Sequence, residues 1–112
     1  MDSYNEKYVK AQLEELVSFS QSKENIIYTI GMIYDHCINT KTSFDQVQFP
    51  CGMKLTFTYN DTYITSPLTI EIESIRKSNK RTLGGVVFPI LSTTYTPGSK
   101  EKCLQYFDRV LY

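Results

Sequence analysis

The sequence predicts a single two-layer α+β domain, in which helices from both ends of the chain cover one face of an antiparallel sheet. Apolar residues recur at helical spacing near both ends of the chain, and they alternate with polar residues in its middle. The length of 112 residues is too short for two globular domains and sufficient for one hydrophobic core. We therefore expect residues 1–112 to form one domain with the order helix, second helix, meander of three to four strands, helix.

The first predicted helix spans about residues 3 to 18. Ser3 and Glu6 have the spacing of a capping box, in which each side chain bonds to the backbone N–H of the other residue. Behind this start, apolar side chains follow at helical spacing: Val9, Leu13, Leu16 and Val17. We expect this stripe to pack on the core.

Residues 23–39 carry two competing patterns. A helical stripe runs through Ile26, Ile30, Ile33 and Cys37, and Ser22 precedes it as an N-cap. The same segment is rich in β-branched and aromatic residues that alternate with period two, which is typical of a strand. We favour the helix, because a strand ending near Tyr34 would leave a long unstructured connection before Val47.

The next segment is predicted to be a β-hairpin. Met53, Leu55, Phe57 and Tyr59 alternate with polar residues, and Asn60-Asp61 supplies a turn. The returning strand places Ile64, Leu68, Ile70 and Ile72 on one face. Pro67 cannot donate to a ladder, so this strand is either broken there or at an edge of the sheet.

A charged hairpin tip over residues 76–81 is expected next, followed by a strand over residues 83–91 that is apolar on both sides. The closing helix is capped by Thr96 or Ser99, and Pro97 fits its first turn. Its apolar residues are Cys103, Leu104, Phe107, Val110 and Leu111. We expect this helix to pack on the sheet.

Composition bears on compartment and partners. The 12 basic and 12 acidic side chains cancel, which gives no general affinity for nucleic acid or anionic membranes. No apolar run is long enough to span a membrane, and the first residues lack the features of a secretion signal. The three cysteines are an odd number without paired spacing, which indicates free thiols. We expect an intracellular protein, cytoplasmic or nuclear, that is not secreted.

No motif predicts catalysis, a cofactor or a metal site. Asp35-His36-Cys37 is the most reactive-looking group, but adjacent residues project in different directions. We interpret Cys37 as a core residue and His36 as a residue near water at the end of its element. The alternative is a small cysteine-dependent enzyme that uses His36 with Cys51 or Cys103. Paired carboxylates such as Glu71 and Glu73 are interpreted as solvent-exposed side chains on one face of a strand.

The favoured function is a non-enzymatic protein–protein interaction domain, a small subunit or adaptor of an intracellular assembly. The chain has nine Tyr and no Trp, and Tyr is enriched at interfaces. A strand that is apolar on both sides also needs a second cover, which a protein subunit or a second copy of the chain would supply. The candidate contact residues are Tyr59, Tyr63, Val86, Phe88 and Tyr106.

A second hypothesis is nucleic-acid or phosphoinositide binding through the tip at residues 76–81. This segment holds four of the twelve cations: Arg76, Lys77, Lys80 and Arg81. Clustered cations of this kind bind phosphate groups. The neutral charge of the whole chain makes this hypothesis weaker than the first.

Overall fold

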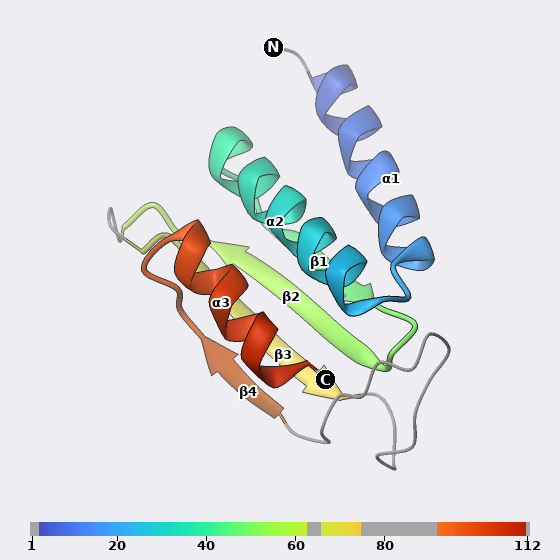
Figure 1. Ribbon diagram of the computed structural model, residues 1–112. Coiled ribbons are helices and arrows are strands. Elements are labelled where there is room, and N and C mark those ends of the chain that lie inside the picture. The colour runs from blue at the N-terminus through green and yellow to red at the C-terminus, as the bar shows by residue number, and fades with distance from the viewer. Residues whose placement is uncertain (1–2, 63–65, 75–91, 112) are drawn as a thin grey trace.

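The computed structural model describes residues 3–62, 66–74 and 92–111, with side chains from residue 8 onward and without that of Ser74. Its elements are α1 (Ser3–Phe19), α2 (Lys23–Thr40), β1 (Phe44–Gln48), β2 (Met53–Tyr59), β3 (Leu68–Ser74), β4 (Ser92–Tyr95) and α3 (Lys100–Val110). The helices lie on one side of an antiparallel sheet with the strand order β1-β2-β3-β4 (Figure 1). This arrangement confirms the predicted α+β class with a meander and a helix at each end.

Helix α2 lies in the middle of the helical layer and settles the ambiguity of its sequence in favour of the helix. Ser22 is its N-cap and its Oγ accepts a hydrogen bond from the backbone N–H of Asn25. The helical stripe faces the sheet and is fully buried: Ile26, Ile30, Ile33 and Cys37. Tyr28, which a strand would place on the same face as Ile26, is exposed instead.

Helix α1 lies at the edge of the helical layer, beside α2 and above β1 (Figure 1). Leu13 and Val17 are buried against these neighbours. Val9 and Leu16 were expected in the same core-facing stripe, but both are exposed. Among the described elements, α1 contacts α2 and β1, and part of its apolar arc stays outside the core.

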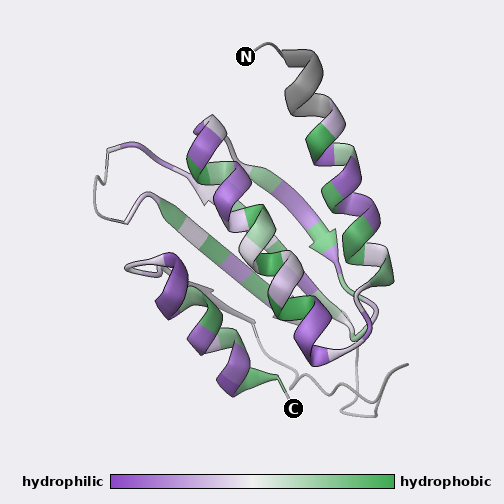
Figure 2. Cartoon of the chain, turned by 45° about the horizontal axis from the view of Figure 1, so that its top comes forward, coloured by the Kyte–Doolittle hydropathy of each residue, from purple (hydrophilic) through white to green (hydrophobic). Residues whose placement is uncertain are grey.

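The sheet separates an apolar inner face from a polar outer face. Pairing brings Leu55 opposite Ile72, and Phe57 opposite Ile70, on the face that the helices cover. On the outer face Lys54 lies opposite Glu73, with 3.1 Å between Lys54 Nζ and Glu73 Oε1. Figure 2 shows this alternation along the strands as changes in hydropathy. The prediction that Glu71 and Glu73 face away from the core is confirmed, since both are exposed.

The connections differ from the sequence-based expectation in two places. Asn60 does start a turn, since its Oδ1 accepts the N–H of Thr62, but the loop continues to Pro67. Strand β3 begins directly after Pro67 and lies between β2 and β4, so the proline precedes an interior strand. The alternative that placed this strand at an edge is therefore wrong.

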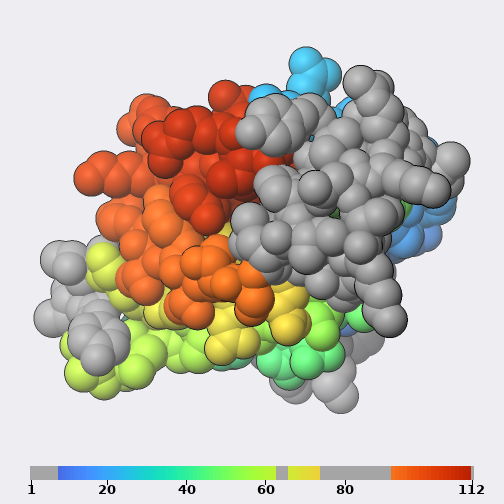
Figure 3. Space-filling model, turned by 90° about the horizontal axis from the view of Figure 1, so that it is seen from below, coloured from blue at the N-terminus to red at the C-terminus, as the bar shows by residue number. Residues whose placement is uncertain are grey.

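Helix α3 begins at Lys100, which agrees with the predicted cap at Ser99 and not with the alternative cap at Thr96. Ser99 is the N-cap and its Oγ accepts the N–H of Lys102, so Thr96 is not the cap and Pro97 precedes the first turn. Cys103 and Phe107 are buried beneath the helix. Figure 3 shows α3, in red, above the orange β4, so the two layers are seen in profile.

Candidate interaction surface

The sequence-based contact residues fall into two groups. Tyr59 and Tyr106 are described, and both are partly buried against the core. The Tyr106 ring stacks on Tyr95 with 4.1 Å between the ring centroids. Tyr106 therefore contributes to holding α3 on β4.

The other candidates lie outside the described residues. These are the contact candidates Tyr63, Val86 and Phe88 and the phosphate-binding candidates Arg76, Lys77, Lys80 and Arg81. The predicted hairpin tip at 76–81 and strand at 83–91 fall in the same stretch. All of these assignments stay predictions.

The cysteine and histidine candidates lie in the core. Cys37, Cys51 and Cys103 form no disulfide and are buried, as the sequence indicates for structural thiols. His36 was expected near water, but only 8% of it is exposed, and its ring meets that of Phe44 edge-on at 5.9 Å. His36 is buried because it lies on the side of α2 that faces β1.

Two of the thiols have a raised pKa, whereas nucleophilic catalysis needs a cysteine whose pKa is lowered. Burial raises the pKa of Cys37 to about 12, and burial likewise raises the pKa of Cys103 to about 12. A catalytic cysteine has a lowered pKa, because the thiolate is the nucleophile. Cys37 and Cys103 are therefore protonated at neutral pH and suit a core role.

In the described part of the chain, no three His, Cys, Asp or Glu side chains gather in a way that would hold a metal ion. Within the same ranges, no helix combines the length and the apolar character that crossing a bilayer requires.

The exposed apolar surface of the described residues lies on the helical layer, where sequence reasoning did not place it. The large hydrophobic side chains with high exposure are Tyr8 (58%), Val9 (39%), Leu16 (36%), Phe19 (69%) and Tyr28 (65%). All of them belong to α1 and α2. Val9 and Leu16 were assigned to the core from their spacing, and neither Phe19 nor Tyr28 was a candidate contact residue.

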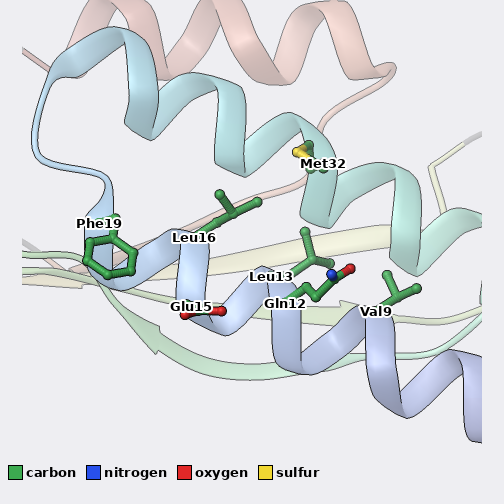
Figure 4. A pocket seen from close by; sticks show the side chains of 7 residues that line it. All are labelled: Val9, Gln12, Leu13, Glu15, Leu16, Phe19 and Met32. Carbon is green, nitrogen blue, oxygen red and sulfur yellow. The ribbon is translucent and has the colours of Figure 1, made fainter.

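Two shallow hollows open on this layer. The first, of about 340 Å³, lies between α1 and α2, and Figure 4 shows Leu13 and Leu16 of α1 on the side toward Met32 of α2, with Glu15 on the side away from it. The second, of about 400 Å³, lies between α2 and α3, where Met32, Tyr28 and Leu104 line it. Met32 lines both, so the two hollows lie on either side of its side chain.

We call this surface the helical face. It consists of Val9, Gln12, Glu15, Leu16, Phe19, Glu24, Ile27, Tyr28, Gly31, Met32, Lys100 and Leu104. Gly31 keeps the second hollow open, since a Cβ at this position would lie 3.4 Å from Lys100 Cε and 3.5 Å from a methyl carbon of Leu104.

Ion pairs neutralise the lysines beside this face. Lys100 Nζ lies 2.6 Å from Asp35 Oδ2, and Lys23 Nζ lies 3.4 Å from Asp108 Oδ1. Glu15 and Glu24, which line the two hollows, form no ion pair with another described residue. Within the described residues, the helical face is therefore apolar and carries two carboxylates that have no ion-pair partner.

Comparisons of the chain with protein-family models, with curated proteins and with solved structures find no match.

Proposed function

We propose that this protein is a non-enzymatic protein–protein interaction domain, a small subunit or adaptor of an intracellular assembly, that docks a partner through the helical face. The observation that carries the proposal is the position of its exposed apolar side chains. Phe19 and Tyr28 are about two-thirds exposed and lie on adjacent helices, where each lines one of the two neighbouring hollows.

The amount of apolar surface supports docking. An aromatic side chain offers roughly 200 Å² of area, so Phe19 and Tyr28 together expose roughly 270 Å². Val9, Leu16 and the partly buried Met32 add to this area. A stable interface buries about 800 Å² on each partner, and its centre is apolar and aromatic. The helical face therefore offers an apolar centre of the size that such an interface needs.

The opposite side of the molecule is a weaker candidate. Its described strand residues are polar, with Thr58 opposite Thr69 and Thr56 opposite Glu71. Such a surface gains little from losing water, because its hydrogen-bonding groups are already solvated. The candidate contacts Tyr59 and Tyr106 lie partly buried at the sheet and on α3, and their role in docking stays a prediction.

Site-specific photocrosslinking in the native cell tests the proposal. A benzophenone side chain replaces Phe19 in one variant and Thr58 in another, and both positions are exposed. We expect the variant at position 19 to form a discrete covalent adduct with a protein, and the variant at position 58 to form none. Adducts at position 58 alone, or none at either position, would contradict docking through the helical face.

A further inference from the structure

The helical face combines exposed aromatic rings with carboxylates, and together these indicate the chemistry of its partner. Glu15 lies four residues before Phe19 on α1, and Glu24 lies four residues before Tyr28 on α2. Residues at this spacing are neighbours on the surface of a helix. Each of the two most exposed aromatic rings of the helical face therefore has a carboxylate beside it.

A carboxylate beside an aromatic ring favours a cation. The face of an aromatic ring attracts an ammonium or guanidinium group, and a carboxylate accepts charge-assisted hydrogen bonds from the same groups. The nearby Lys23 and Lys100 do not fill this role, because they pair with Asp108 and Asp35. Among the described residues, no lysine or arginine pairs with Glu15 or Glu24, so both carboxylates can accept a cation from a partner.

The shape of the face favours a helix as the occupant. Along α1 the lining residues Val9, Gln12, Leu16 and Phe19 follow the alternating spacing of three and four residues that characterises a helix-packing seam. The hollow between two antiparallel helices accepts the ridge of a third helix. From Val9 to Phe19 the seam is about 15 Å long, which corresponds to about three turns of an amphipathic helix.

We propose that the helical face binds a basic amphipathic helix of a partner protein, whose apolar side lies along α1 and α2 and whose Lys or Arg side chains contact Glu15 and Glu24. This inference rests on the proposed docking function and adds the chemistry of the partner. A second copy fits less well, because a two-fold symmetric contact through this face would bring the carboxylates together. An anionic membrane would be repelled by the same carboxylates.

Peptide binding to the full chain tests the proposal. The first probe is a capped 18-residue helix with leucine on its apolar side and lysine elsewhere, and the second replaces every lysine by glutamate. We expect the leucine–lysine peptide to bind, more weakly as salt rises, and the leucine–glutamate peptide to bind at least tenfold more weakly.

A matched pair of variants locates the site. Glu15→Gln with Glu24→Gln removes both carboxylates of the helical face, and Glu14→Gln with Glu71→Gln removes two exposed carboxylates elsewhere. The net charge changes equally in both variants. We expect the first variant to weaken binding of the lysine peptide about tenfold and the second to leave it within twofold.

The outcomes separate the two proposals. If both peptides bind equally and Phe19→Ser weakens both, docking through the face stands and the basic partner is wrong. If the two double variants weaken binding of the lysine peptide equally, net charge alone attracts the peptide, and this result also overturns the inference. If neither peptide binds and the chain forms a dimer that Phe19→Ser dissociates, the occupant is a second copy. If neither peptide binds and the chain stays monomeric, the basic helix is excluded, and photocrosslinking at position 19 decides whether the face docks another partner.

Discussion

The thiols of Cys37 and Cys103 lie in the core, on α2 and α3, without any exposed surface. Burial raises the pKa of each thiol from 9.0 to about 12, because the thiolate would lose its hydration there. Burial is also the main cause that raises the pKa of Tyr34. These groups are more easily deprotonated in the unfolded chain than in the folded one.

This difference predicts a loss of stability at high pH. Above pH 9 the unfolded thiols release protons that the folded thiols retain up to about pH 12, so the free energy of unfolding falls as the pH rises through this range. A variant with Cys37→Ala and Cys103→Ala should start less stable, owing to lost packing, and should lose stability less steeply with pH. Denaturant unfolding at several pH values measures both slopes. Identical slopes in the two proteins would show that the thiols of Cys37 and Cys103 do not cause the loss of stability.

The spacing of residues predicted which side chains share one face of a helix or strand. It did not predict how much of that face the neighbouring elements would bury. Leu13 and Leu16 belong to the same predicted stripe, yet only Leu13 is buried. His36 was expected near water because it lies near the end of its segment, but the position of α2 over β1 encloses it. In both cases the outcome depends on packing between elements, which spacing along one element does not specify.

At the scale of elements, local signals predicted most of the secondary structure. For residues 23–39 the Ser22 cap and the helical stripe competed with a strand pattern, and the long connection that a strand would leave favoured the helix, which the structure confirms. Alternation predicted β2, whereas the two-residue turn at Asn60-Asp61 was too short. Strand β4, over Ser92–Tyr95, was not predicted, although its Thr and Tyr residues have high strand propensity. Four residues are too few for a periodic signal.

The approach of α3 to α2 gives a prediction at this scale. Gly31→Ala should raise the free energy of unfolding by about 0.5–1 kcal/mol, because alanine favours the helix and its Cβ meets only ordinary contacts with Lys100 and Leu104. Thermal or denaturant unfolding measures the change. A loss of stability would show that the two helices have no room for a methyl group at this crossing.

At the scale of the whole molecule, the sequence predicted surplus apolar surface but placed it on the sheet. The described outer face of the sheet is polar, and the described surplus lies on α1 and α2. This location depends on the order of the helices in their layer. Because α1 lies beside α2 and β1 at the edge of the described layer, only part of its wide apolar arc packs on another described element. The apolar segment at 83–91, which carried the original argument, lies outside the described residues.

The central claim is that Phe19 and Tyr28 serve docking and contribute little to folding. Sedimentation of the tagged chain in an extract of its native cell tests this claim most directly, when the wild type is compared with Phe19→Ser/Tyr28→Ser and with the control Thr58→Ser. We expect the wild type and the control to sediment in an assembly and the double variant to sediment as a free chain of 13.0 kDa plus its tag. Its purified stability should stay within about 0.5 kcal/mol of the wild type, since both side chains are exposed. If the double variant stays in the assembly like the wild type, the helical face is not the docking surface.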